Sequence, residues 1–377
     1  MLDSGQRHAV RSRLFIPWGW PRREVTSVAE GEPGQGVPGA FARAAGARRP
    51  DADRAALACC AGGRSMRVVG HSEGTAGVCG ESELMRMRDL CDLVLLAALW
   101  GGSFLFMRYA APAFGPLPLI WLRVAVAAAC LTPLLMLRRQ VGALREHAFG
   151  IVVVGVFSSA LPFALIAWAM LSITAGLASI LNATVPIFTA LIGAVWLRER
   201  LGATRAAGLV VGFVGVLVLA AGQADFKPGG SGWAILAMLL ATLSYGFAAH
   251  LTRRLLGAVP ALVSAAGSQI AAAIVMTPLA LWSWPAESPG HLAWSAAITL
   301  GVGCTALAFL IFFRLIANVG AARAVTVTFL IPLFGILWGS IFLGERLDAG
   351  MLVGGAIVVL GTALATGVLR WPSRRRA

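Results

Sequence analysis

Residues 186–201 read PIFTALIGAVWLRERL, and residues 332–347 read PLFGILWGSIFLGERL. The two stretches lie 146 residues apart (332 − 186), and both begin with proline and end with Glu-Arg-Leu. Each is an apolar run closed by charged residues, which is typical of the end of a membrane-spanning helix. An apolar helix that occurs twice predicts a membrane protein built from an internal repeat.

The similarity between the two stretches extends over most of the chain. At the same shift of 146 residues the matches are Gly155 with Gly301, Phe163 with Phe309, Gly193 with Gly339, Gly208 with Gly354 and Gly215 with Gly361. A shift of 145 residues matches Gly101 with Gly246, Arg108 with Arg253, and Thr132-Pro133 with Thr277-Pro278. Each repeat holds five apolar runs, an odd number, so the second repeat must enter the membrane with the opposite orientation.

The composition agrees with a membrane protein. Hydrophobic residues make up 58% of the 377 residues and charged residues only 13%, whereas soluble proteins average about 45–50% and about 25%. From residue 90 onward, apolar runs of about 20 residues follow one another, enough for each to cross the bilayer as a helix. The sequence therefore predicts an all-α membrane protein of ten transmembrane helices in two inverted five-helix repeats (5+5). The predicted helices are 90–110, 116–137, 149–170, 174–197, 204–222, 232–252, 259–283, 292–316, 320–343 and 349–369.

The basic residues predict the orientation of these helices. With the N-terminus in the cytoplasm, fourteen arginines lie on the inner side and three basic residues lie on the outer side. The inner set is Arg86, Arg88, Arg138, Arg139, Arg145, Arg198, Arg200, Arg205, Arg253, Arg254, Arg370, Arg374, Arg375 and Arg376, and the outer set is Arg108, Lys227 and Arg346. Both termini are therefore expected to be cytoplasmic. The net charge of +14 reflects this orientation, and we expect no nucleic-acid partner.

The chain is predicted to divide into four segments. Residues 1–84 are rich in Arg, Gly and Pro without a sustained period, so they form either a disordered tail or a misassigned start upstream of Met85 or Met87. Residues 85–222 form the first repeat, residues 232–369 the second, and residues 370–377 a basic cytoplasmic tail. The six cysteines have no metal-binding or disulfide spacing, so we expect no metal site and no cofactor.

Four stretches of the sequence resemble the EamA-type members of the drug/metabolite transporter superfamily. They are Trp100-Gly101-Gly102-Ser103-Phe104, Pro118 to Arg123, Pro186 to Leu201, and Pro332 to Leu347. The resemblance covers about residues 88–369. It implies a ten-helix 5+5 fold, a central cavity, and export or exchange of metabolites, but it does not identify a substrate.

A polar face follows the fourth predicted helix. Ser179, Asn182, Pro186 and Thr189 recur at spacings of three and four residues, and Thr328 lies on the matching face of the ninth helix. We predict that Asn182, Thr189 and Thr328 line a substrate cavity, because a buried amide or hydroxyl needs partners. Four residues on these faces are predicted to serve as helix hinges or packing positions instead: Pro186, Gly193, Pro332 and Gly339.

Five other polar or aromatic residues within the predicted helices are candidates for the same cavity: Ser103, Arg123, Trp168, Tyr245 and Gln269. For Arg123, two interpretations stay open. The side chain either extends to the membrane interface or attracts an anionic group such as a substrate carboxylate. Trp168 and Tyr245 have the alternative role of interfacial aromatic residues.

The absence of familiar sequence motifs constrains the mechanism. No Asp or Glu lies in the middle of a predicted helix, so the sequence shows no buried carboxylate proton carrier. It contains no Gly-rich phosphate loop and no His-Glu-x-x-His or Gly-x-Ser-x-Gly motif, so we predict no catalytic residues and no enzyme activity.

We therefore expect a secondary transporter of the cell (inner) membrane that exports small metabolites, such as amino acids, by alternating access. Its expected partners are a small-molecule solute and the lipid bilayer, and a homodimer stays open. The alternatives are a membrane-embedded transferase and a non-transporting scaffold or receptor.

Overall fold

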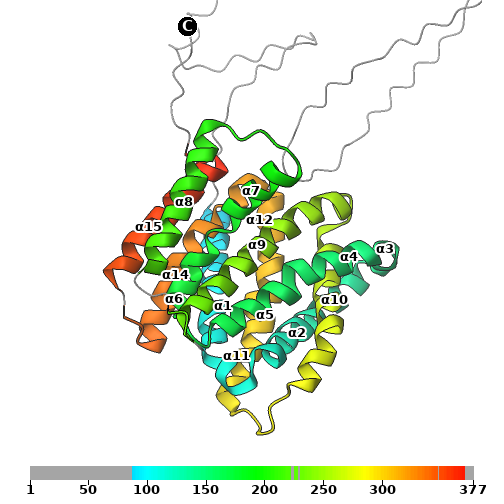
Figure 1. Ribbon diagram of the computed structural model, residues 1–377. Helices are drawn as coiled ribbons and strands as arrows, with labels where there is room; N and C mark the ends of the chain where they lie inside the picture. The colour runs from blue at the N-terminus through cyan, green and yellow to red at the C-terminus, as the bar shows by residue number, and fades with distance from the viewer. Residues whose placement is uncertain (1–86, 222–224, 228–229, 347, 370–377) are drawn as a thin grey trace, which may run out of the picture. The chain divides into compact units, whose positions relative to one another are not determined.

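The computed structural model describes residues 87–221, 225–227, 230–346 and 348–369, and all regular secondary structure within these ranges is helical (Figure 1). Our predictions for residues 1–84 and 370–377, including the arginines there, lie outside these ranges. The elements are α1 (Met87–Phe114), α2 (Pro116–Leu137), α3 (Val141–Glu146), α4 (Ala148–Gly155), η1 (Val156–Ala160), α5 (Leu161–Ala169), α6 (Ala175–Asn182), α7 (Val185–Trp196), α8 (Ala203–Ala221), α9 (Ser231–Leu255), α10 (Ala261–Trp282), α11 (His291–Gly301), η2 (Val302–Leu307), α12 (Ala308–Val319), α13 (Ala321–Ala324), α14 (Val327–Leu343) and α15 (Ala349–Thr366).

The helices are long and apolar enough for a membrane protein. Nine candidate membrane spans lie within the described residues, when α4-η1-α5, α6-α7 and α11-η2-α12 each count as one span. Helix α14 is apolar as well, with 17 residues. Only 33% to 61% of each span is buried inside the protein, and large apolar side chains such as Leu217, Ile274 and Leu281 point outward, each 67% or 68% exposed. Such outward faces require lipid around them, so the predicted all-helical, multi-pass membrane protein is confirmed.

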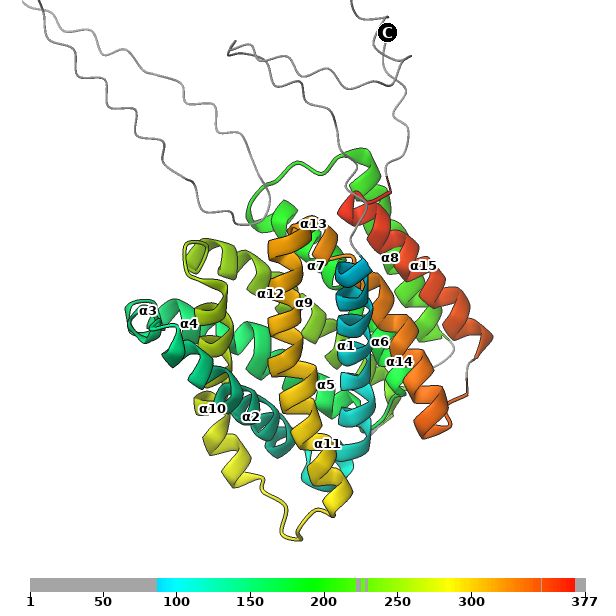
Figure 2. The ribbon, with the colours of Figure 1, turned by 180° about the vertical axis from the view of Figure 1, so that it is seen from behind.

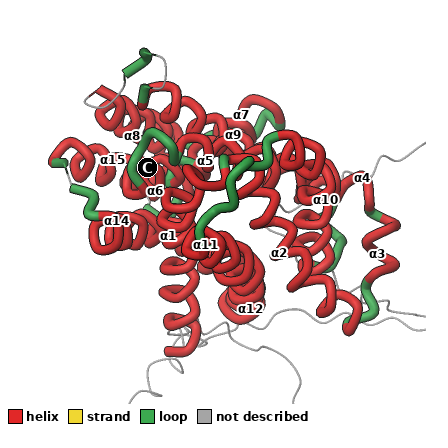
Figure 3. The backbone as a smooth tube through the Cα atoms, turned by 90° about the horizontal axis from the view of Figure 1, so that it is seen from below, coloured by secondary structure: helices red, strands yellow, loops and turns green. Residues whose placement is uncertain are grey.

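Helices from the two predicted repeats pack mainly against each other. Helix α2 lies along α10, and α8 lies along α15, so these two pairs each join equivalent helices of the two repeats. The two pairs occupy opposite edges of the bundle (Figures 1 and 2). Between them, α1 packs on α14, and α9 packs on α5 and α7 (Figure 3). The main hydrophobic core therefore lies between the repeats.

Glycines bring α8 and α15 into backbone contact. A Cβ atom at Gly208 would lie 2.8 Å from the carbonyl oxygen of Gly361, and a Cβ atom at Gly215 would lie 3.1 Å from that of Gly354. These two contacts are equivalent, because the 146-residue shift converts Gly208 into Gly354 and Gly215 into Gly361. Small residues of this kind let membrane helices approach closely enough for extensive van der Waals contact.

Two of the predicted helices are interrupted. The predicted helix 174–197 breaks after Asn182 and resumes at Val185, because Pro186 lacks an N–H and is tolerated only in the first turn of a helix. The predicted helix 320–343 breaks between α13 and α14, and Pro332 lies inside α14. The two breaks are not at equivalent positions, since Ala183 and Thr184 match residues inside α14.

The close approach of α8 and α15 generates a first prediction. Replacing Gly215 by alanine would place a Cβ atom 2.7 Å from the backbone nitrogen of Val358, so we expect the variant to be destabilised by about 1–3 kcal/mol through overpacking. The measurement is the thermal unfolding temperature of the purified protein in detergent. Gly142→Ala in α3 is the matched control, because nothing lies within 4 Å of that Cβ, and it should unfold at or above the wild-type temperature. If Gly215→Ala and Gly142→Ala unfold at the same temperature, the close contact of α8 with α15 is contradicted.

Candidate functional site

Two widened helical turns occupy equivalent places in the two repeats. The π-helical segment η1 (Val156–Ala160) follows α4, and η2 (Val302–Leu307) follows α11, 146 residues later (302 − 156). Proline alone does not cause these turns, because Pro162 follows η1 whereas Ala308 occupies the matching position after η2. Short π-helical turns occur frequently at functional sites, so the polar groups that these turns position are candidates for such a site.

Each π-helical turn presents a hydroxyl to a long polar side chain from the other repeat. Arg123 of α2 donates from Nε to Oγ1 of Thr305 in η2, at 3.0 Å. Gln269 of α10 donates from Nε2 to Oγ of Ser159 in η1, at 2.9 Å. All four side chains are buried, with exposed fractions between 0% and 5%. The two hydrogen bonds therefore join the repeats inside the bundle, where water does not compete for the partners.

The two hydrogen bonds are related by the internal repeat, although not perfectly. Ser159 and Thr305 are strict counterparts (305 − 159 = 146). Arg123 matches Ser268 at the 145-residue shift of this region, because the Arg123 carbonyl contacts Gly301 in the same way that the Ser268 carbonyl contacts Gly155. Gln269 is thus one residue beyond the position equivalent to Arg123. The two repeats build the same type of contact with different chemistry, a cation in one and a neutral amide in the other.

The surroundings of Arg123 are apolar and aromatic. Its guanidinium carbon lies 3.6 Å from the centre of the Phe163 ring, and its Nη1 approaches the sulfur of Met107 at 3.5 Å. Tyr245 packs edge-on against Phe163, with 6.3 Å between ring centres. The two ion pairs among the described residues are Arg253–Glu199 and Arg314–Asp92, and neither includes Arg123. A buried cation next to an aromatic face is favourable, but its positive charge has no carboxylate beside it.

Gln269 is also incompletely paired. Its carbonyl oxygen, Oε1, is buried and has no hydrogen-bond partner within the described part of the chain. A buried acceptor without a donor costs about 1–3 kcal/mol. We define Arg123, Ser159, Phe163, Tyr245, Gln269 and Thr305 as the central polar cluster.

The structure brings three of the eight predicted cavity residues together in this cluster: Arg123, Tyr245 and Gln269. Asn182 lies half-buried at the last position of α6, beside the helix break. The hydroxyls of Thr189 and Thr328 donate to backbone carbonyls four and three residues earlier in the chain, those of Val185 and Val325.

The remaining two candidates lie on other helices. Ser103 is buried in α1, with 5% of its surface exposed. Trp168 is 45% exposed at the surface of α5. The assignment of these residues to a substrate cavity stays a prediction.

Sequence reasoning missed several buried polar residues, and four of them join helices through side-chain contacts. Ser159 and Thr305 were overlooked because hydroxyls are common in membrane helices, yet the 146-residue shift that pairs them was available as a signal. Asp89 and Asp92 lie in the first turns of α1 and are each 5% exposed. Their spacing of three residues places both on one helical face, where Asp89 accepts a hydrogen bond from Asn318 and Asp92 pairs with Arg314.

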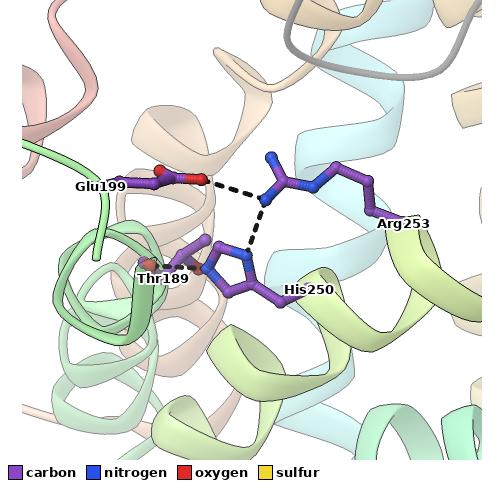
Figure 4. Close-up of polar contacts among 4 residues, drawn as sticks. All are labelled: Thr189, Glu199, His250 and Arg253. Carbon is purple, nitrogen blue, oxygen red and sulfur yellow. Dashed lines mark hydrogen bonds and ion pairs between the residues drawn. The ribbon is translucent and has the colours of Figure 1, made fainter. Parts of the chain in front are cut away.

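A second polar group joins the repeats at one end of the bundle (Figure 4). Glu199, after α7, forms an ion pair of 3.1 Å with Arg253 of α9. The same guanidinium contacts Nδ1 of His250 at 3.2 Å, and Nε2 of His250 lies 2.9 Å from the carbonyl oxygen of Thr189. Because a carbonyl can only accept, Nε2 carries the proton and Nδ1 accepts from Arg253. This chain of contacts links the end of α9 to α7.

The equivalent glutamate acts at the opposite end. Glu345, after α14, accepts hydrogen bonds from the backbone N–H groups of Ala175 and Gly176 at 2.7 and 3.2 Å. These are the first two residues of α6, whose N–H groups have no partner within the helix. Arg108 of α1 donates to the nearby carbonyl of Met170. Glu345 therefore caps α6 of the other repeat, and its negative charge faces the positive end of the helix dipole.

Glycines make room for both carboxylates. A Cβ atom at Gly193 would lie 3.0 Å from Oε2 of Glu199, and a Cβ atom at Gly339 would collide with Oε2 of Glu345. In both places the glutamate N–H also donates to the glycine carbonyl, at 3.1 Å. These contacts supply a packing reason for the predicted roles of Gly193 and Gly339.

The comparison with known proteins agrees with this two-repeat architecture. The model of the EamA-like transporter family matches the chain twice, at residues 90–221 and 232–367. The chain belongs to the EamA-like transporter family. The predicted resemblance to this family is confirmed, and the chain is a membrane transporter.

Several relatives of this EamA-like chain are similar over nearly their full length. A protein of Streptantibioticus cattleyicolor named "Probable terminal-alkyne amino-acid exporter" is 27% identical, over 72% of this chain and 91% of that protein. An "Uncharacterized transporter" of Archaeoglobus fulgidus is 22% identical, over 73% and 97%. The "Uncharacterized inner membrane transporter YedA" of Escherichia coli is 24% identical, over 75% and 93%. A crystal structure with 20% identity superimposes with a TM-score of 0.55, over 74% of this chain and 98% of the other, which supports the fold.

The capping of α6 in this EamA-like chain generates a second prediction. Glu345→Gln removes the charge and replaces one accepting oxygen by an NH₂ group, so we expect a loss of about 1–3 kcal/mol in stability. The measurement is the thermal unfolding temperature in detergent. Glu287→Gln is the matched control, because that side chain lies exposed in the loop before α11. If both variants unfold at the same temperature, the hydrogen bonds that Glu345 accepts do not stabilise α6.

Proposed function

We propose that this protein is a secondary transporter that exports small metabolites by alternating access between two five-helix halves. In this proposal α13 and α14 together form the ninth of ten spans, residues 85–222 and 232–369 are the two halves, and both termini lie in the cytoplasm. The membrane is the inner membrane of the cell, and the exported solutes are amino acids or related compounds.

The observation that carries this proposal is the central polar cluster. A cation, an amide and two hydroxyls lie between the halves in a bundle whose core is mainly apolar, and the cluster is closed to its surroundings, with Arg123 4% and Gln269 0% exposed. Intramembrane polar groups are costly and usually mark a substrate or ion pathway. A site that is closed in one conformation can bind a solute only if the halves move apart.

The contacts of Glu199 and Glu345 support such a movement. Each glutamate belongs to one half and binds the other half, at opposite ends of the bundle. The two contacts differ in strength, because Glu345 binds two backbone N–H groups whereas the side chains of Arg253 and Glu199 are 41% and 35% exposed. In the proposed cycle these contacts open in turn, and the pair of Glu199 and Arg253, which lies on the cytoplasmic side in our orientation, opens more easily.

The choice of solutes rests on the relatives and on Asn182. One relative is named as an amino-acid exporter. Asn182 ends the half-helix α6, and discontinuous helices of this kind form solute sites in other transporters because their ends leave backbone groups available. A transferase would instead need clustered carboxylates or histidines at one membrane face. Here Glu199 and Glu345 lie at opposite ends.

Alternating access generates a third prediction. A single cysteine at Asn182, in a full chain whose six cysteines are replaced by serine or alanine, should react with a membrane-impermeant maleimide from both sides. Intact cells test the outer side, and inverted vesicles test the inner side. A cysteine at the exposed position Leu217 on the outward face of α8 is the control, because the lipid should block its labelling from either side. Labelling of position 182 from one side alone, or from neither, would contradict the proposed cycle.

The direction of transport is tested by spent-medium metabolite profiling. Cells that express the full chain should accumulate one class of solute outside, compared with cells that express Asn182→Ala at the same level in the membrane. The absence of any difference would count against export, and a solute that disappears faster from the medium would indicate import.

A further inference from the structure

We infer that the solute of this protein carries a carboxylate that binds Arg123 and an N–H group that donates to Oε1 of Gln269. This inference rests on the proposed function and names the chemistry of its substrate. It divides recognition between the two halves, because Arg123 belongs to the first repeat and Gln269 to the second.

The argument begins with the charge of Arg123. A guanidinium has five N–H donors, and the structure pairs Nε with Thr305 and Nη1 with the sulfur of Met107. Sulfur is a weak acceptor, and the Phe163 ring stabilises the cation without accepting the remaining N–H groups in their plane. Most of the hydrogen-bonding capacity of the cation is therefore unused, in a place where desolvation is expensive.

The chain itself does not supply the missing anion near Arg123. The eight acidic residues of the described ranges are Asp89, Asp92, Glu146, Glu199, Asp225, Glu287, Glu345 and Asp348, all at helix ends or in loops. Six of them already bind other groups. Asp92 and Glu199 form ion pairs with Arg314 and Arg253, and the other four accept hydrogen bonds: Asp89 from Asn318, Asp225 from the N–H of Lys227, Glu345 from the start of α6, and Asp348 from the N–H of Gly350. Extension of Arg123 to the interface, the alternative from the sequence, is excluded in this conformation because the residue is only 4% exposed.

Gln269 provides the second half of the recognition. The amide nitrogen Nε2 of Gln269 donates to Oγ of Ser159, and the amide oxygen Oε1 is buried without a partner in the described part of the chain. Ser159 and Phe163 lie four residues apart across the η1–α5 junction, so one short segment of the first repeat contacts both Gln269 and Arg123. A guanidinium donor and an amide acceptor that contact the same segment are complementary to a carboxylate and an N–H group of one solute. Phe163, Tyr245 and Met107 form an apolar wall for the remainder of the solute.

The experiment uses matched series of small molecules and the purified full chain. For each of three amino acids, L-leucine, L-phenylalanine and L-serine, the series contains the free amino acid, its amide, and the acid that lacks the amino group. Ligand-induced shifts of the thermal unfolding temperature give the affinities. We expect at least one free amino acid to bind, its amide to bind at least about tenfold more weakly, and the deaminated acid to bind with intermediate affinity.

Variants separate binding from folding. In Arg123→Gln the affinity for the free amino acid should fall about tenfold or more, and Arg123→Lys should retain part of it because the charge remains but the planar fork is lost. Gln269→Leu should make the amino acid and the deaminated acid equivalent. Arg145→Gln, an exposed arginine of α3, is the control for the loss of one positive charge. Size-exclusion profiles identify any variant that fails to fold.

The inference is overturned if no carboxylate of the three series binds, if an amide binds as tightly as its acid, or if binding survives in folded Arg123→Gln. Proteoliposome flux distinguishes this failure from failure of the proposed function. If an amide is transported and Arg123→Gln does not change its flux, the protein is a transporter but its solute does not bind through a carboxylate. If carboxylates bind through Arg123 but no member of the series is transported, the binding site is supported and the transport function is contradicted.

Discussion

The hydrogen bonds from Arg123 to Thr305 and from Gln269 to Ser159 join the two halves where neither water nor lipid offers an alternative partner. In such surroundings a polar side chain is either paired or costly, and this constraint governs much of the structure. It accounts for two opposite halves whose polar groups face each other, whereas their outward faces carry leucine, isoleucine and valine. Oε1 of Gln269 and several N–H groups of Arg123 are exceptions to this constraint, and the proposed solute would supply their hydrogen-bond partners.

The same constraint explains the ends of the bundle. The start of α6 and the break after Asn182 leave backbone groups without helical partners, and side chains from the other repeat bind them. Glu345 binds the first N–H groups of α6, and Thr362 of α15 donates to the carbonyl of Ala183 at the break, at 2.8 Å. Because the two breaks lie at different places in the repeats, the halves are similar in sequence but differ in conformation. A difference of this kind fits the proposed cycle, in which the halves would exchange conformations.

Much of the fold could be predicted from the sequence because its strongest signals are local. Apolar runs of about 20 residues define spans, and the match of residues 186–201 with 332–347 defines the repeat. The break after Asn182 could not be placed, because Pro186 is compatible both with a kinked helix and with the first turn of a new one. Arg123 and Gln269 were predictable because charged and amide side chains are rare in apolar runs. Ser159 and Thr305 were harder to single out, because membrane helices carry many hydroxyls that bond only to their own backbone, as Thr189 and Thr328 do, and only the 146-residue shift pairs these two.

The glycine contacts between α8 and α15 have a consequence for how such a chain can arise. The pairs Gly208–Gly361 and Gly215–Gly354 exchange under the repeat, so the surface that joins the halves is self-complementary, like the isologous interface of a two-fold dimer. The covalent connection between the halves supplies a high effective concentration, but the shape of the interface is already encoded in either half alone. A single five-helix unit, inserted in both directions, would present this surface to its own copy. Fusion of two such units would fix their orientations and free each copy to diverge, as the arginine in one half and the glutamine in the other have done.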